Sequence, residues 1–129
     1  MISKHEVKSF INELKELVNN DRFDIDSDFV FINTTKASDD YLYSTRFTLL
    51  DLEYDSYDVL DKLLELKTEE YSESVLDKDD SNPLWLHVFG KKINNKLIYI
   101  KIKIRSSDNK QIVCVSFHYA KNNMSFPYC

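Results

Sequence analysis

Two histidines, a tyrosine and two lysines occur in the C-terminal third of the sequence, on three apolar segments that are each typical of a β-strand. His87 stands in the first segment, Tyr99, Lys101 and Lys103 in the second, and His118 in the third. Strand side chains alternate between two faces, so residues two apart share a face at about 6–7 Å, and adjacent strands lie about 5 Å apart. The alternation predicts that these five side chains converge in one patch.

Such a patch has the groups that cleave RNA without a metal ion. Cleavage needs a base for the 2′-hydroxyl proton, an acid for the 5′-oxygen, and cations for the charged phosphorane. His118 and His87 are the candidate acid and base, in either order, and Tyr99 would orient the phosphate or the leaving group. Aromatic rings stack on unpaired bases, and basic or polar groups contact the RNA backbone. The candidate RNA-binding residues are Trp85, Phe89, Lys91, Lys101, Lys103 and Ser116.

Each of these residue types also has an ordinary structural role. Lysines in a strand commonly face solvent or protect a sheet edge. A single histidine is more often a hydrogen-bonded surface residue than a catalyst, and aromatic residues more often pack than bind bases. Cys114 falls on the same face by its alternation and is expected to be inert. The hypothesis of RNA cleavage therefore depends on the coincidence of these residue types on one face.

Composition argues against several other kinds of site. The one glycine, Gly90, excludes a glycine-rich phosphate loop. The two cysteines form no CxxC, and no histidines stand at ligand spacing, which argues against a zinc site or a disulfide scaffold. We expect no metal and no cofactor. No run approaches the ~20 apolar residues that span a bilayer, and residues 1–16 are typical of a charged helix rather than a signal peptide, so the expected location is the cytoplasm.

Charge divides the chain into two unequal parts. Residues 1–83 hold 9 Lys and Arg against 21 Asp and Glu, whereas residues 84–129 hold 8 Lys and Arg against one acidic residue, Asp108. The balances are −12 and +7, which give the net charge of −5. This asymmetry indicates either an anionic partner for the basic part or a surface on which acidic helices lie beside a basic sheet.

The elements that would position the patch follow from the apolar pattern. A capping box at Ser3–Glu6 predicts a helix over residues 4–19, and Asp55 is the expected N-cap of a second helix. Segments 84–93, 96–105 and 111–119 are the expected antiparallel strands, the first two joined by a turn at Asn94–Asn95. Residues 29–32 could form a short strand, residues 34–40 are turn-like, and residues 41–43 are strand or loop.

These elements predict one α+β domain over residues 1–129, with a mainly helical part before residue 84 and the sheet after it. The middle strand places Ile98, Ile100, Ile102 and Ile104 on one face, which must be core. The matching core sets are Leu84, Leu86 and Val88 in the first strand and Val113, Val115 and Phe117 in the third. Helices are expected to cover this face and to leave the other open.

The stretch from Leu50 to Tyr128 resembles the MqsR-type toxins of bacterial toxin–antitoxin pairs, especially those of Gram-positive bacteria. The resemblance depends on an ordered set of segments, of which no single one is diagnostic. These are LLEL (63–66), TEEY (68–71), WLHVFGK (85–91), IYIKIKI (98–104), CVSFH (114–118) and FPY (126–128).

The resemblance implies a RelE-like fold, in which helices pack on one face of a small antiparallel sheet and the other face binds mRNA. It implies an endoribonuclease that needs no metal, cuts single-stranded mRNA and is silenced by a cognate antitoxin. Tyr99 then matches a tyrosine implicated in catalysis, and Lys101 matches a lysine on the same strand. His118 stands where some members carry a catalytic lysine, and another family lysine falls near Ser72.

Two other functions fit the same sequence. A non-catalytic RNA- or protein-binding module would use the same basic face, and would bind without cutting. A small interaction protein would dock through its acidic N-terminal half, and would not bind nucleic acid.

Overall fold

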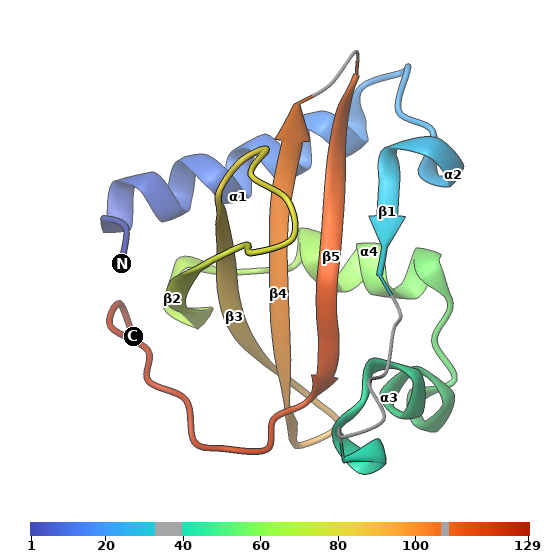
Figure 1. Ribbon diagram of the computed structural model, residues 1–129, viewed down its shortest axis with the longest axis vertical. Coiled ribbons are helices and arrows are strands. Elements are labelled where there is room, and N and C mark those ends of the chain that lie inside the picture. Colours follow the sequence, from blue (N-terminus) through green and yellow to red (C-terminus); the bar gives the residue numbers. More distant parts are fainter. Residues whose placement is uncertain (33–39, 107–108) are drawn as a thin grey trace.

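The computed structural model describes residues 1–32, 40–106 and 109–129. In this part of the chain, five strands form one sheet in the order β1-β5-β4-β3-β2, and helices α1 and α4 lie behind it in Figure 1. The helical elements are α1 (Lys4–Asn19), α2 (Ile25–Asp28), η1 (Tyr41–Tyr43), α3 (Thr45–Leu52), α4 (Ser56–Leu64) and η2 (Thr68–Glu70). The strands are β1 (Phe29–Phe31), β2 (Tyr71–Leu76), β3 (Trp85–Ile93), β4 (Lys96–Ser106) and β5 (Lys110–Tyr119). The predicted α+β class is confirmed.

Both predicted helix starts are capped as the sequence indicates. At α1 the amide of Glu6 donates to Ser3 Oγ at 3.1 Å, and the amide of Ser3 donates to Glu6 Oε1 at 3.3 Å. Asp55 and Asp58 make the same reciprocal pair at α4, with both distances 3.0 Å. These bonds satisfy amides that a helix start leaves unpaired. Both helices then bury an apolar stripe, which ties them to the sheet.

The hydrophobic core lies between these helices and β4. Ile98, Ile100 and Ile102 are fully buried and Ile104 is nearly so, as the alternation predicts. Val7 of α1 and Leu63 of α4 are also fully buried and belong to the same core. We call the sheet face that carries these isoleucines the helix face, and the opposite face, which carries Tyr99 and Lys101, the open face.

The turn between β3 and β4 forms where it is predicted. Asn94 and Asn95 both have left-handed backbones, with φ of 53° and 65°, and Ile93 pairs with Lys96. Two successive positive φ values define the type I′ turn, which asparagine tolerates better than most residues. This turn fixes the register of the central hairpin.

Some other elements were not predicted from the sequence, or were left open. Residues 45–52, for which no element was predicted, form helix α3, which follows the N-cap Ser44. Residues 71–76 form an additional strand, β2, which pairs with β3 across the long connection at 77–84. Of the segments left open, residues 29–31 are a strand parallel to β5 and residues 41–43 are a 3₁₀ turn. Residues 34–39 of the predicted polar turn lie outside the described residues.

The face predicted for β3 is wrong. His87 pairs with Ile102 and Phe89 pairs with Ile100, so both lie on the helix face, whereas Val88 pairs with Lys101 on the open face. A shift of one residue exchanges the two faces of a strand. Both alternate sets of β3 are apolar, so periodicity alone does not show which set faces the core. The residues that this places on the helix face instead of the open face are Trp85, His87, Phe89 and Lys91.

The face of β5 changes partway along the strand. Ser116 pairs with Lys101, but Cys114 pairs with Ile102, and the intervening residue, Val115, forms a bulge. A bulge inserts one residue and so reverses the alternation on one side of it. His118 and Ser116 are on the open face as predicted, whereas Cys114 is fully buried on the helix face. Burial raises the pKa of the Cys114 thiol, which agrees with its expected inertness.

The C-terminal tail packs on the open face over Gly90. A Cβ atom at Gly90 would lie 2.7 Å from Cζ of Phe126 and 3.0 Å from Sδ of Met124. The ring of Tyr128 then stacks on that of Tyr71, with centroids 5.9 Å apart. The absence of a side chain at Gly90 therefore lets the tail cross β3 and form one wall of the open face.

Replacing Gly90 with alanine is expected to push Phe126 and the tail off the sheet, at a cost of about 1 kcal/mol, the lower end for overpacking. Urea unfolding measures the loss. In a protein that already carries Phe126→Ala, the same replacement should cost little, because the clashing ring is gone. An equal loss in both backgrounds would show that the tail does not lie on Gly90.

Candidate functional site

The open face carries a pocket of about 490 Å³ where β2, β4, β5 and the tail meet. We call this hollow the candidate pocket. Four of the nine predicted site residues line it, together with two residues of β2 and residues 120–125 of the tail. The six side chains contributed by the sheet are Ser72, Glu73, Tyr99, Lys101, Ser116 and His118.

His118 and Tyr99 form the centre of the candidate pocket. They pair directly across β4 and β5, and their rings stack with centroids 5.1 Å apart and planes 14° apart. His118 Nδ1 donates to the carbonyl oxygen of Tyr119 at 2.9 Å, because a carbonyl can only accept. In a neutral ring this hydrogen bond leaves the Nε2 atom as the basic nitrogen. The stack and the hydrogen bond together hold the imidazole in one orientation.

Tyr99 is held as a neutral phenol. Burial raises its pKa, and the negative charge of Glu73 raises it further. The hydroxyl therefore keeps its proton at neutral pH and can donate a hydrogen bond. Lys101 Nζ lies 6.0 Å from the centre of the Tyr99 ring. A hydroxyl donor and an ammonium group thus lie near the imidazole, which suits an anionic group between them.

Glu73 is the acidic residue that sequence reasoning missed. It is exposed on β2, pairs with Val88 on the open face, and lines the candidate pocket together with Ser72. Its carboxylate adds a second group able to take a proton, beside the imidazole of His118. The strand-like pattern of residues 71–76 was the available signal, but the pairing that brings β2 beside β3 is long-range.

Lys103 is on the open face but is not available to a ligand. Its side chain is 1% exposed, and Nζ lies 2.7 Å from Asp77 Oδ2 and 3.2 Å from Asp80 Oδ2. The same ammonium donates to the carbonyl oxygens of Asp80 and Pro83. The segment 77–84 crosses in front of β4 in Figure 1 and covers it. The prediction that Lys103 joins the patch is therefore wrong, because the acidic connection folds back and neutralises it.

His87 is also separated from His118, since it lies under α1. Its Nδ1 hydrogen-bonds Ser74 Oγ at 2.7 Å, and its ring meets the ring of Phe10 edge-on with centroids 4.6 Å apart. Burial lowers the pKa of His87. Ser74 Oγ in turn hydrogen-bonds the hydroxyl of Tyr71. The prediction that the two histidines converge is wrong, because Phe10 and Ser74 hold His87 on the helix face.

The remaining predicted RNA-binding residues of β3 do not line the candidate pocket. Phe89 is fully buried and packs against Phe10. Lys91 Nζ forms an ion pair with Glu70 at 3.5 Å on the helix face. Trp85 is half-exposed at the start of β3, where it pairs with Leu76.

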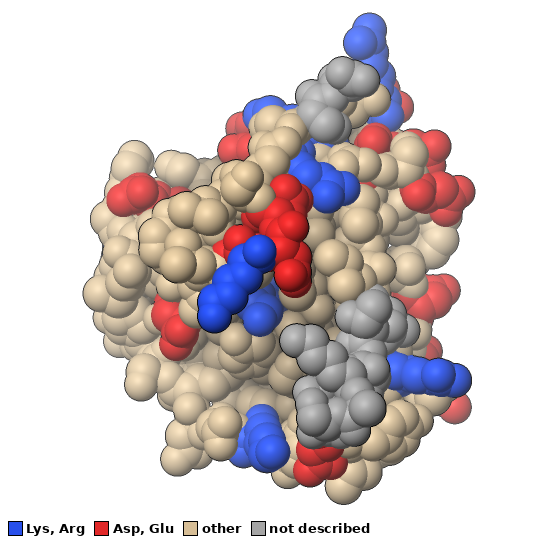
Figure 2. Space-filling model, in the orientation of Figure 1, with Lys and Arg blue, Asp and Glu red and all other residues tan. Residues whose placement is uncertain are grey.

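The open face carries both signs of charge. Figure 2 shows basic and acidic side chains next to one another over the middle of the sheet. Arg105 adds to this pattern, since its guanidinium lies 3.3 Å from Asp80. Part of the positive charge of residues 84–129 is therefore neutralised within the molecule. This agrees in part with the expectation that acidic segments lie beside a basic sheet, although Asp80 belongs to the connection 77–84 and not to a helix. The cations that line the candidate pocket are Lys101 and Lys121.

The part of the chain that the structure describes has neither a metal-binding cluster nor a membrane-spanning helix. No group of three or more His, Cys, Asp or Glu side chains could hold a metal ion. No helix in this part of the chain has the length and apolar character needed to cross a membrane.

Comparison with known proteins identifies one family. The family model described as "Motility quorum-sensing regulator, toxin of MqsA" matches residues 33–119, which include α3, α4 and strands β2 to β5. Searches of the curated proteins and of the solved structures gave no match.

Proposed function

This chain belongs to the MqsR toxin family, and on that premise we propose that it is an endoribonuclease that cuts single-stranded mRNA without a metal ion. Membership makes it the toxin of a toxin–antitoxin system, with a cognate antitoxin as its partner. We further propose single-stranded mRNA as its substrate and the cytoplasm as the place where it acts. The observation that carries the proposal is the stacked pair of Tyr99 and His118, with Lys101 beside it, in a pocket on the open face.

In the proposed reaction, the 2′-hydroxyl of one nucleotide attacks the adjacent phosphorus. The Glu73 carboxylate takes the hydroxyl proton, and the His118 imidazolium protonates the departing 5′-oxygen. The bond between phosphorus and that oxygen breaks, which leaves a 2′,3′-cyclic phosphate and a 5′-hydroxyl. Glu73 replaces His87 as the partner of His118, because it lines the same pocket.

The other two residues stabilise charge during this step. The Tyr99 hydroxyl, which keeps its proton, donates to a non-bridging phosphate oxygen. The Lys101 ammonium stabilises the charge that develops on the phosphorane. Both groups need only bind the phosphate, so neither changes its protonation state in the reaction.

The direct test is incubation of the purified protein with a long single-stranded RNA in EDTA, followed by analysis of the fragment ends. Discrete cuts with 5′-hydroxyl and cyclic phosphate ends support the proposal. Intact RNA would contradict it, and a binding titration would then separate the two alternatives. Binding without cleavage identifies a non-catalytic RNA-binding module, and no binding identifies a protein-interaction role.

RNA binding is expected to depend only weakly on salt. Each phosphate contact on a single strand contributes about −0.7 to the slope of log affinity against log salt. Lys101 and Lys121 line the candidate pocket, so we expect a slope of about −1.4 for an oligonucleotide short enough to occupy this pocket alone. Titration of the His118→Ala protein with RNA at several salt concentrations measures this slope, because the variant should bind RNA without cutting it. A slope of about −3 would show that further lysines, such as Lys91 and Lys103, leave their acidic partners for the RNA.

A further inference from the structure

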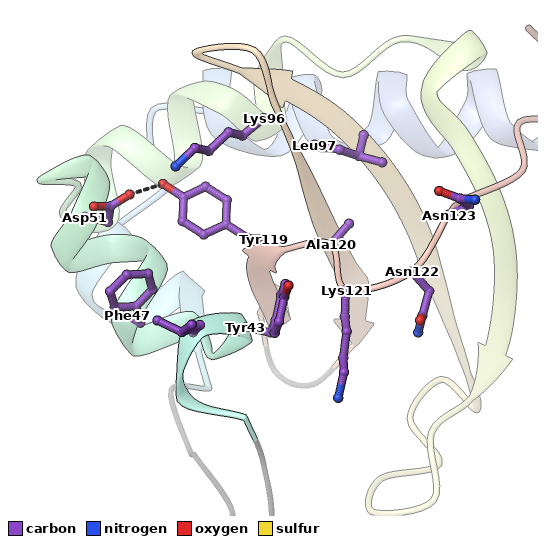
Figure 3. Close-up of a pocket in the computed structure, with 11 residues that line it drawn as sticks. Tyr43, Phe47, Asp51, Lys96, Leu97, Tyr119, Ala120, Lys121, Asn122 and Asn123 are labelled. Carbon is purple, nitrogen blue, oxygen red and sulfur yellow. Dashed lines mark hydrogen bonds between the residues drawn. The ribbon is translucent and has the colours of Figure 1, made fainter.

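A second hollow, of about 570 Å³, adjoins the candidate pocket at the end of β5. We call it the side pocket. Its walls come from η1, α3, the start of β4, Tyr119 and the first residues of the tail (Figure 3). Residues 120–123 line both hollows. A strand of RNA that leaves the candidate pocket across this segment therefore enters the side pocket.

Aromatic rings form one end of the side pocket. Phe47 of α3 meets Tyr119 with ring centroids 6.3 Å apart at 63°, and Tyr43 of η1 lies next along the wall. The Tyr119 hydroxyl donates to the carboxylate of Asp51. Burial and this neighbouring charge raise the pKa of Tyr119 to about 12. The hydrogen bond to Asp51 thus holds the Tyr119 ring as a neutral phenol, and the ring forms part of the aromatic wall.

Cations and amides complete the side pocket. Lys96 Nζ lies 4.9 Å from the centre of the Tyr119 ring, and Lys121 Nζ lies 6.0 Å from that of Tyr43. Asn122 and Asn123 are exposed at the end opposite Asp51 and Phe47 (Figure 3). Ammonium groups bind phosphate, aromatic rings stack on bases, and amides hydrogen-bond base edges. The volume lies within the range of pockets that hold small ligands.

We propose that the side pocket binds a nucleotide next to the one that is cut, and so contributes to the choice of cleavage sequence. The inference rests on the proposed function, because it takes the RNA from the candidate pocket. The base would lie against the rings of Tyr43 and Phe47, and its phosphate near Lys96. The edge of a base that extends from these rings toward the opposite end of the side pocket would face Asn122 and Asn123, whose amides would distinguish one base from another through hydrogen bonds.

The test uses 2′-O-methyl RNA oligonucleotides of two to six residues, which lack the attacking hydroxyl, and measures their affinity by calorimetry. Affinity is expected to rise by about 5- to 150-fold for the shortest oligonucleotide that reaches the side pocket, because this is the gain in affinity that stacking of one base gives. Lys96→Glu and the double variant Tyr43→Leu with Lys96→Gln should remove this step and leave the affinity of the shortest oligonucleotide unchanged. Lys4→Gln, an exposed lysine of α1, is the matched control and should keep the step.

The outcomes separate this inference from the proposed function. A step that persists in Lys96→Glu, or that is absent from the unmodified protein, overturns the side pocket whether or not RNA is cut. A step that the variants remove supports the side pocket even if the EDTA assay finds no cleavage. Failure to bind an oligonucleotide of any length overturns both. Lys96 is an exposed residue, so the Lys96→Glu arm does not depend on the folding of the Tyr43 variant.

Discussion

Replacing His118 with alanine is expected to lower kcat/KM for RNA cleavage by about 10²- to 10⁴-fold, the usual contribution of one general acid or base. The ring of His118 is only partly buried, and it stacks on the ring of Tyr99. We therefore expect the free energy of unfolding to change by less than about 1 kcal/mol, as for most substitutions outside the core. A time course of fragment formation gives the rate of cleavage, and urea unfolding gives the free energy of unfolding.

His87→Ala is the matched control for this prediction. It should keep cleavage per folded molecule but lower the free energy of unfolding by about 1 kcal/mol, because Ser74 Oγ loses a partly buried hydrogen-bond partner. Glu73→Gln should lower cleavage like His118→Ala. The double variant should be little worse than either single one, since groups that act on one step are not additive. Loss of cleavage in His87→Ala with normal stability, and not in His118→Ala, would reverse the assignment.

The features that could be predicted from the sequence are those decided by local chemistry. The capping boxes at Ser3 and Asp55 mark helix starts because the side chains satisfy amides a few residues away. The Asn94–Asn95 pair marks the hairpin because it tolerates left-handed backbone. In β4, isoleucines alternate with polar residues, so one face is unmistakably apolar. Tyr99 and Lys101 were placed correctly because they stand opposite those isoleucines.

The features that escaped prediction depend on long-range pairing. The two faces of β3 are similar in hydrophobicity, so only its register with β4 shows that His87 lies under α1. The bulge at Val115 moves Cys114 to the core, and nothing in the local pattern of β5 marks it. Glu73 joins the candidate pocket only because β2 returns beside β3. The face of the sheet on which the candidate residues lie was therefore predicted correctly where β4 and β5 meet, and incorrectly along β3.

Lys103 is also buried by a long-range contact, because the connection 77–84 folds over it. Replacing Lys103 with methionine is expected to lower the free energy of unfolding by about 3–5 kcal/mol. The ammonium is buried against Asp77 and Asp80 and also donates to two backbone carbonyls. Without it, the Asp77 carboxylate, whose side chain is 8% exposed, stays buried with no cation at 2.7 Å. Urea unfolding at neutral pH measures the loss. Lys92→Met, at an exposed position of β3, is the control and should change stability by less than about 0.5 kcal/mol.

The pH dependence tests the same ion pair independently. Burial alone would raise the pKa of Asp77, but hydrogen bonds from Lys103 and from the amides of Asp79 and Asp80 outweigh it, so the pKa lies below its usual value. A carboxyl with a lowered pKa stabilises the fold above its unfolded pKa, about 3.9, and loses that contribution as pH falls through the folded value. The difference in the free energy of unfolding between the native protein and Lys103→Met should therefore narrow as pH falls below about 4, and should be smallest below the lowered pKa of Asp77, where this carboxyl is neutral in both proteins. A difference that stays constant from pH 7 to pH 3 would mean that Lys103 stabilises the fold through packing and its carbonyl contacts rather than through charge.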